Sequence, residues 1–259
     1  MCELLAMNAS HDADLDTLLT ALRPRDSEVG PQADGWGVAL YDGRAAHVFK
    51  EPKAVADSTS FAALQDQGFA SRTILAHIRR ANPPGVGRRF ANTHPFEREL
   101  AGRSWVFAHK GVLSDIRALP LTGFHPTGRT DSEYAFCLLL EAIRPTLPAD
   151  GRIDAPDALL GHLVPAVSAI IRHGEFNAVL SDGDHLIVHA HTRLHLLERQ
   201  HRAAGGEQTV ALIATHPLTD DEPWACLLPN TLSLFRQGRL LAQRTTQGPA
   251  SDPLWWHHA

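Results

Sequence analysis

The sequence MCELLAM at residues 1–7 places a cysteine immediately ahead of a short apolar segment. An apolar run of this length is typical of a buried strand. If Met1 is removed, Cys2 carries both a thiol and a free α-amine. An α-amine has a pKa of about 7.7–8.0, so it can act as the base that activates the thiol. The alternative is that Cys2 is only a small apolar residue at the start of a strand, and position alone favours that alternative.

Outward from this segment, the N-terminal half shows short apolar runs separated by turn residues. The leucines in residues 12–22 recur at helical spacing, which predicts a helix closed by Pro24. Residues 54–67 predict a second short helix, and the polar residues 81–98 predict a loop. Asp42-Gly43 is a hairpin signal. The expected strands are 2–7, 35–41, 45–49, 73–79 and 105–109.

The C-terminal half begins with two expected helices and then changes to strands. Thr130 is a candidate N-cap, followed by acidic residues in the first turn of a helix that runs to about Ile143. Residues 156–172 predict a second helix, kinked near Pro165. The expected strands are 176–180, 185–191, 194–199, 210–215 and 232–236. This order predicts an α+β fold with antiparallel sheets rather than a parallel βαβ repeat.

The composition limits the classes of protein. The chain has 259 residues and a net charge of −5, which argues against nucleic-acid binding through overall charge. No apolar run reaches the roughly 18–20 residues of a membrane span, and the N-terminus lacks a signal peptide. Three cysteines do not indicate a disulfide scaffold. We expect a cytoplasmic protein with one domain at residues 2–248 and a flexible tail at 249–259.

Several motifs follow one another in a fixed order over most of the chain. They are MCELLAM (1–7), DGWGVALYDG (34–43), AHIRRAN (76–82), NTHPF (92–96), FAHKGVL (107–113), TDSEYAFCLLL (130–140), FNAVLSDG (176–183) and ATHPLT (214–219) with Trp224. In this order and spacing the chain resembles the class II glutamine amidotransferases, and among them the YafJ-type bacterial members. The resemblance implies the four-layer α/β/β/α fold of the N-terminal-nucleophile hydrolases.

The same resemblance implies roles for individual residues. Cys2 matches the nucleophile that attacks a side-chain amide and forms a γ-glutamyl thioester. Arg79 matches the arginine that holds the substrate α-carboxylate, and a guanidinium suits that bidentate contact. Asp131 matches the acid that receives the α-ammonium group. Gly111 matches the glycine whose N–H points at the oxyanion.

Three further residues, Asn92, Thr93 and His94, lie in a loop that the resemblance places along the same pocket. Taken in isolation, Arg79 would be interpreted as a surface arginine on a strand. Asp131 would be interpreted as a first-turn acid that only favours the helix dipole. Because the family resemblance also includes Cys2, we favour the functional interpretation of both Arg79 and Asp131.

One position departs from the family pattern. The family has His-Asn-Gly where this chain has His109-Lys110-Gly111. The asparagine amide normally donates to the oxyanion, and loss of one such donor costs about 10²–10³ in rate. Lysine can also donate hydrogen bonds, but its ammonium is a flexible point charge rather than a planar amide. The sequence leaves open whether Lys110 preserves or breaks the oxyanion site.

The expected activity is a glutaminase-type amide hydrolysis that releases ammonia from glutamine or a γ-glutamyl amide. No cofactor is expected, and an ammonia-accepting synthase would have to be a partner protein. One alternative is an amidohydrolase that removes a glutamyl group from a peptide-like metabolite. Another is a non-catalytic, ligand-binding relative in which Lys110 has disabled the site. Neither a nucleic-acid nor a membrane partner is expected, and the sequence does not indicate the oligomeric state.

The histidines and the remaining cysteines have simpler interpretations. His189 and His191 share a face of an expected strand, which would suit a metal. A site would need a third ligand and outer-shell partners, so we expect solvated or packed histidines, on a surface edge strand, and no metal. Cys137 and Cys226 are interpreted as core thiols. Trp36 is expected to pack near the N-terminal strand.

Overall fold

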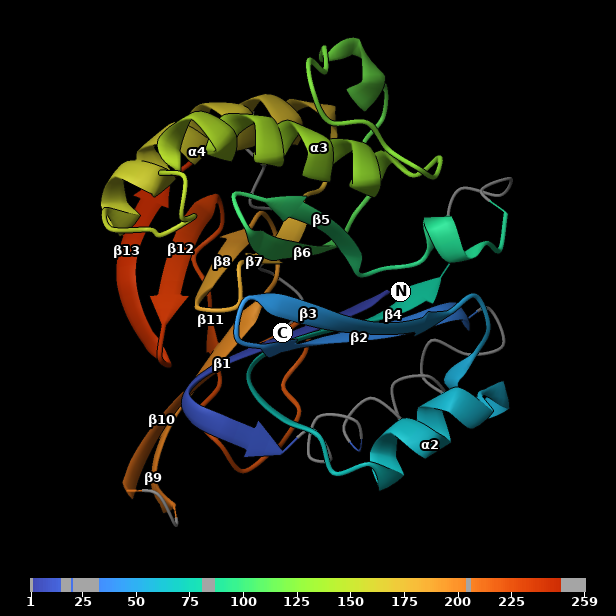
Figure 1. Ribbon diagram of the computed structural model, residues 1–259, viewed down its shortest axis with the longest axis vertical. Helices are drawn as coiled ribbons and strands as arrows, with labels where there is room; N and C mark the ends of the chain where they lie inside the picture. The colour runs from blue at the N-terminus through green and yellow to red at the C-terminus, as the bar shows by residue number, and fades with distance from the viewer. Residues whose placement is uncertain (1, 15–19, 21–32, 81–86, 204–205, 248–259) are drawn as a thin grey trace, which may run out of the picture.

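Two β-sheets stacked face to face form the centre of the molecule (Figure 1). The structure is a computed structural model that describes residues 2–14, 20, 33–80, 87–203 and 206–247. Every strand pair within these residues is antiparallel. The α+β class with antiparallel sheets is therefore confirmed.

The first sheet contains the N-terminal strand at its centre. It has seven strands in the order β11-β9-β10-β1-β4-β2-β3. Strand β1 (Glu3–Asp14) lies between β10 (Gly206–Ala214) and β4 (Ala70–Arg80). The other strands are β2 (Ala33–Asp42), β3 (Ala45–Glu51), β9 (His195–Ala203) and β11 (Ala225–Cys226). The first seven residues of β1 are buried, which explains why the strand is apolar on both faces.

The second sheet has six strands in the order β13-β12-β8-β7-β6-β5. These are β5 (Phe96–Leu100), β6 (Arg103–Lys110), β7 (Asn177–Ser181), β8 (His185–Ala190), β12 (Thr231–Arg236) and β13 (Arg239–Thr245). The middle strands β7 and β8 are buried along their whole length.

Helices cover the outer face of each sheet. Phe61 and Leu64 of α2 (Thr59–Asp66) pack with Leu5 and Met7 of β1 on the outer face of the first sheet. Helices α3 (Asp131–Ile143) and α4 (Pro156–Ile170) cover the second sheet (Figure 1). Short 3₁₀ turns lie at Val55–Asp57, Phe90–Asn92, Ile116–Ala118, Arg144–Thr146 and Ile171–His173. The four-layer α/β/β/α arrangement is confirmed.

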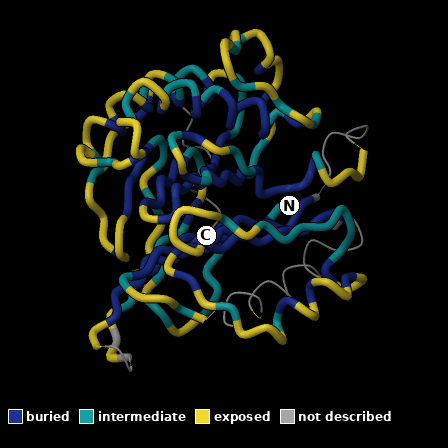
Figure 2. Tube along the Cα trace, viewed as in Figure 1, coloured by how far each residue is buried: buried dark blue, intermediate teal, exposed yellow. Residues whose placement is uncertain are grey.

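A separate core fills the space between the sheets. Leu4 and Ala6 of β1 and Leu75 of β4 pack there against Val106 and Ala108 of β6. Figure 2 shows the buried trace concentrated in the two sheets and the exposed trace in the loops around them. Alternation along the strands therefore sends one set of side chains to the intersheet space and the other to the helices.

Most of the expected elements are confirmed. The hairpin turns at Gly43, which has a φ of +60°, between β2 and β3. Thr130 caps α3, since its hydroxyl oxygen accepts a hydrogen bond from the Glu133 N–H at 3.1 Å. Trp36 packs beside β1, as expected, with its ring centroid 5.0 Å from that of Phe61.

The prediction of a helix at 12–22 is wrong for its first residues. Strand β1 continues to Asp14, because Ala13 pairs with Ser71 and Asp14 with Ala70 after an irregularity that follows Asn8. Pairing with β4 thus keeps Ala13 and Asp14 extended. Apart from Thr20, the rest of the expected helix lies outside the described residues.

Other expectations also need correction. The loop expected at 81–98 ends early, because β5 begins at Phe96 and pairs with Phe107. Cys137 is buried as expected, but Cys226 is exposed, since it lies in the two-residue edge strand β11. Strands β11 and β13 have no counterpart among the expected elements. The expected tail at 249–259 lies outside the described residues.

The strand that carries His189 is not a surface edge. Strand β8 lies between β7 and β12 and is wholly buried, so His189 is a packed core histidine. Its Nδ1–H donates to the Phe176 carbonyl at 2.7 Å, and its Nε2 lies 3.0 Å from the Thr246 hydroxyl. Among the residues described here, no helix is both long enough and apolar enough to cross a membrane.

Candidate active site

The predicted nucleophile lies at the edge of the intersheet space. Leu4 and Ala6 face this space while Leu5 and Met7 face the outer helix layer, so alternation directs Cys2 inward. Cys2 is half-buried. The start of β1 is fixed by Thr215, whose hydroxyl accepts from the Leu4 N–H at 2.8 Å and whose own N–H donates to the Leu4 carbonyl at 3.0 Å.

Strand register brings Cys2 and Arg79 together. Glu3 pairs with Ile78 in the antiparallel β1–β4 ladder, so the next position along it places Cys2 opposite Arg79. Leu75 of β4 faces the intersheet space, and Arg79, four residues on, faces the same way. The guanidinium and the thiol therefore share one end of this space.

A carboxylate from β2 holds Arg79 in place. Asp34 Oδ2 lies 3.6 Å from Arg79 Nη1, and the Arg79 and Asp34 side chains are only 6% and 3% exposed. Gly35 pairs with Arg79 in a tight space, because an added Cβ would lie 3.2 Å from Thr93 Cγ2 and 3.3 Å from Arg79 Cβ. This close approach brings the predicted pocket loop against Arg79.

The pocket loop is held by a lysine that lies outside the sequence motifs. Thr93 and His94 are buried, and the His94–Pro95 peptide bond is cis. Lys50 of β3 donates to the Thr93 carbonyl at 2.8 Å and to the Pro95 carbonyl at 2.9 Å. Its ammonium also lies 4.7 Å from the centroid of the Phe90 ring. Burial lowers the pKa of Lys50 to about 8.

Two buried histidines contact each other, His77 from β4 and His94 from the loop. The rings of His77 and His94 are 4.2 Å apart between centroids. Burial, followed by the influence of His109 and Arg79, lowers the pKa of His77 to about 3. Burial likewise lowers the pKa of His94 well below its ordinary value. Both rings are therefore neutral at physiological pH and add no charge beside Arg79.

The Lys110–Gly111 segment closes the end of β6. Val106 and Ala108 face the intersheet space, so alternation directs Lys110 the same way. Gly111 has a φ of +152°, and an added Cβ would lie 1.8 Å from the Glu175 carbonyl oxygen. Only glycine fits this backbone path.

Asp131 is joined to the same segment by hydrogen bonds. Its Oδ2 accepts from the Leu113 N–H at 2.7 Å, and its Oδ1 accepts from the Ser132 N–H at 2.9 Å. Ser132 Oγ lies 2.9 Å from His109 Nδ1. Burial lowers the pKa of His109, and the neighbouring Asp131 carboxylate opposes that shift. Asp131 thus lies beside the His109–Gly111 turn.

The structure sorts the predicted site residues into two groups. Cys2 and Arg79 belong to the first sheet and are joined by strand register, with Thr93 against Arg79 through Gly35. Lys110, Gly111 and Asp131 belong to the second sheet and α3, and are joined by hydrogen bonds and backbone packing. His77 lies close to His94, and both Arg79 of the first group and His109 beside the second lower the pKa of His77.

Sequence reasoning missed three residues that hold this arrangement, namely Asp34, Lys50 and Glu175. Asp34 is the first residue of the DGWGVALYDG motif, and this position could have indicated a role for Asp34 in the site. Lys50 and Glu175 lie outside the quoted motifs, and no local pattern distinguishes them from surface charges.

The predicted site residues offer a thiol, a guanidinium, a carboxylate and a lysine followed by a glycine. Strand alternation directs Cys2 and Arg79 toward the intersheet space from the first sheet and Lys110 from the second, while Asp131 lies at the start of α3 and binds the Leu113 N–H. Within the described part of the chain, no cluster of three or more His, Cys, Asp or Glu residues has the arrangement of a metal site.

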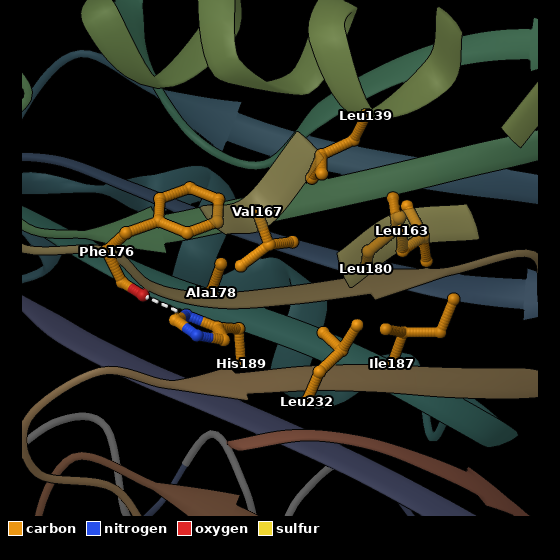
Figure 3. Close-up of a pocket in the computed structure, with 9 residues that line it drawn as sticks. All are labelled: Leu139, Leu163, Val167, Phe176, Ala178, Leu180, Ile187, His189 and Leu232. Atoms are coloured by element: carbon orange, nitrogen blue, oxygen red, sulfur yellow. Dashed lines mark hydrogen bonds between the residues drawn. The ribbon is translucent and has the colours of Figure 1, made fainter. Parts of the chain in front are cut away.

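An apolar cavity in the second sheet is a packing gap rather than a substrate site. Figure 3 shows it between α3, α4 and the sheet, lined by aliphatic side chains, Phe176 and His189. Its free space is about 10 Å³, which is room for at most one water. A second cavity of about 340 Å³ is lined by Gly87, Arg89, Ala91, Asn92, Thr127, Gly128 and Arg129. It adjoins, along the chain, both the Thr93–His94 loop and Asp131.

Comparison with known proteins identifies a family. The sequence matches the family model described as "Glutamine amidotransferases class-II" over residues 1–205 and 201–255. It is 36% identical over 257 residues to "Putative glutamine amidotransferase YafJ" of Escherichia coli K12, covering 92% of this chain and 98% of that protein. The solved structure of a predicted glutamine amidotransferase from Pseudomonas aeruginosa PA01 superimposes with a TM-score of 0.69 at 33% identity, covering 93% of this chain and 100% of that one.

A hydrolase is also among the relatives. The gamma-glutamyl-hercynylcysteine sulfoxide hydrolase of Mycobacterium tuberculosis H37Rv is 30% identical over 192 residues. The match covers 74% of this chain and 70% of that protein.

Proposed function

Because the chain belongs to the class II glutamine amidotransferases, we propose that it hydrolyses the side-chain amide of glutamine or a γ-glutamyl compound, with Cys2 as the nucleophile. The observation that carries this proposal is the register that sets Cys2 opposite Arg79 at the intersheet space. An α-amino acid head bound by Arg79 would extend its amide toward the thiol.

Removal of Met1 is the first step of the proposal, because it frees the α-amine of Cys2. The amine takes the thiol proton, and the sulfur attacks the amide carbon to form a C–S bond. The carbonyl oxygen becomes an oxyanion, for which the Gly111 N–H and the Lys110 ammonium are the proposed donors. The protonated amine then gives its proton to the leaving nitrogen, the C–N bond breaks and ammonia departs.

Water completes the cycle. The α-amine takes a proton from water, the hydroxide attacks the thioester carbon and the C–S bond breaks. The products are glutamate and the regenerated thiol. Asp131 is the proposed partner of the substrate α-ammonium, with Thr93 and His94 along the pocket wall. The ammonia passes to solvent or to a partner synthase.

The experiment that tests this proposal combines labelling with ammonia release. A glutamine-like electrophile such as diazo-oxo-norleucine should add once, at Cys2, and Cys2→Ala should take up none. Cys226→Ala is the matched control, because Cys226 is exposed yet lies on β11, away from the start of β1. Stabilisation by glutamine without labelling or ammonia release would instead indicate a ligand-binding protein.

A second candidate is removal of a glutamyl group from a larger metabolite. Two observations favour it: the similarity to a γ-glutamyl hydrolase and the 340 Å³ cavity beside Asn92 and Arg129. A series of γ-glutamyl amides of increasing size distinguishes the two candidates. A rise in kcat/KM with leaving-group size supports the hydrolase, whereas a maximum at glutamine supports the glutaminase.

A further inference from the structure

Glu175 contacts three consecutive residues of the proposed oxyanion segment. It lies in the connection between the Ile171–His173 turn and β7. Its carbonyl oxygen is 3.0 Å from His109 Nε2 and occupies the space where Gly111 would carry a Cβ. Its carboxylate Oε1 is 3.4 Å from Lys110 Nζ. One residue therefore sets the surroundings of His109, Lys110 and Gly111 together.

The Glu175 carboxylate is itself held in place. Asn177 Nδ2 donates to Oε1 at 2.8 Å, and the Thr192 hydroxyl donates to the same oxygen at 2.9 Å. Asn177 is fully buried, and its Oδ1 accepts the backbone N–H groups of His191 and Thr192. The carboxylate is therefore anchored to the β7–β8 end of the sheet rather than free to rotate in solvent.

An anchored carboxylate addresses the physical weakness of lysine as an oxyanion donor. A planar amide presents its N–H in a fixed direction, whereas an ammonium on a four-carbon stem does not. Donors stabilise a transition state best when they are already oriented before the charge develops. The Lys110 side chain is 13% exposed and that of Glu175 is 40% exposed. The ion pair therefore fixes the direction of a largely buried ammonium at the end of β6. One N–H faces Glu175, and two remain for an oxyanion.

We propose that Glu175 is a positioning residue that holds the Lys110 ammonium, with Asn177 and Thr192, so that lysine performs the role of an oxyanion-hole amide. The inference rests on the proposed amide hydrolysis. It assigns Glu175 no contact with substrate, because its effect passes through Lys110.

A double-mutant cycle of Glu175→Gln and Lys110→Asn tests the inference. The Glu175→Gln change keeps the shape of the side chain and an oxygen that accepts hydrogen bonds from Asn177 and Thr192, but it removes the charge that holds an ammonium. With Lys110 present, Glu175→Gln should lower kcat for glutamine about tenfold with KM unchanged. In the Lys110→Asn variant, where a planar amide needs no such partner, the same change should alter kcat less than about twofold.

Two further variants serve as controls. Thr192→Val removes one hydrogen bond to the carboxylate and should give a smaller loss of kcat when Lys110 is present. Glu207→Gln replaces an exposed glutamate at the start of β10 and should leave kcat unchanged. Thermal unfolding of each variant measures folding separately from turnover.

Three results would overturn the inference. Equal losses of kcat with Lys110 and in the Lys110→Asn variant would show that Glu175 supports the fold rather than the ammonium. No loss of kcat in Glu175→Gln with Lys110 present would show that Glu175 supports neither the fold nor the ammonium. Absence of turnover in the unmodified protein, with no labelling of Cys2, would overturn the proposed hydrolysis and this inference together.

Discussion

The Lys50 ammonium lies 2.8 Å from the Thr93 carbonyl oxygen and so ties strand β3 to the loop that lines the candidate site. A second hydrogen bond, to the Pro95 carbonyl at 2.9 Å, means that the ammonium binds the residues immediately before and after His94. The loop contributes no regular strand pairing of its own at Thr93 and His94. The Lys50 ammonium therefore adds a tie to a neighbouring strand beyond the loop's own hydrogen bonds, such as that from the Thr93 hydroxyl to the Arg89 carbonyl.

Replacing the Lys50 side chain tests this tie. Lys50→Met removes two charge-assisted hydrogen bonds and keeps most of the apolar stem, so we expect a loss of about 1–3 kcal/mol in the free energy of unfolding. We also expect a higher KM for glutamine, because Thr93 would move relative to Arg79. Lys53→Met is the control, since the Lys53 side chain is 41% exposed and pairs with the Glu51 carboxylate. Equal KM values for the two variants would contradict the role of Lys50.

The buried pair of Arg79 and Asp34 gives a second prediction. Asp34→Asn removes the carboxylate that lies 3.6 Å from the Arg79 guanidinium, and breaking a buried pair in this way costs about 3–5 kcal/mol. Urea unfolding should show this loss. Asp42→Asn, at the exposed end of the same strand, should change the midpoint little. A stable Asp34→Asn protein with unchanged KM would show that Asp34 does not hold Arg79.

The departure at Lys110 gives a third prediction. Lys110→Ala removes a proposed oxyanion donor and should lower kcat by about 10²–10³. Lys110→Asn installs the amide of the family pattern and should keep kcat within about tenfold of the unmodified protein. Ammonia release measures both. A rise of ammonia release in Lys110→Asn far above the unmodified protein would support the alternative that lysine disables the site.

The core histidine His189 gives a prediction about pH. Burial lowers its pKa to about 3 in the folded chain, whereas an unfolded histidine titrates near a pKa of about 6.5. Between these values the unfolded chain binds more protons, so stability falls as pH drops from about 6.5 toward 3. The expected slope is up to about 1.4 kcal/mol per pH unit for one such histidine.

His189→Gln removes this titration while retaining a donor and an acceptor for Phe176 and Thr246. Urea unfolding at a series of pH values between about 4 and 7 should show a shallower slope for the variant. His77 and His94 remain in both proteins, so the slope should decrease without vanishing. Identical slopes would exclude His189 as a source of acid sensitivity.

The four-layer order of the fold was implied by the family resemblance, whereas local signals predicted the antiparallel α+β class and individual turns and caps. The hairpin at Asp42-Gly43 and the Thr130 cap are both determined by residues within a few positions. The end of β1 was not predictable in this way. Ala13 and Asp14 lie in a helical pattern, and only pairing with Ser71 and Ala70 of β4 keeps them extended.

The candidate site shows the same limit. Cys2, Arg79, Gly111 and Asp131 lie in motifs, so a resemblance can find them. The register that sets Cys2 opposite Arg79 depends on two strands far apart in sequence, which local patterns do not determine. Glu175 lies one residue outside a motif, and its role depends on where the start of β7 meets the end of β6.

The position of β1 has a consequence for biosynthesis. The start of this strand is held by Thr215, which lies 211 positions after Leu4. On the ribosome, the leading residues therefore wait without this partner until most of the polypeptide has been made, and pairing at such separation is slow. For the proposed removal of Met1, an aminopeptidase would have that whole interval in which to act before β1 pairs with its neighbouring strands.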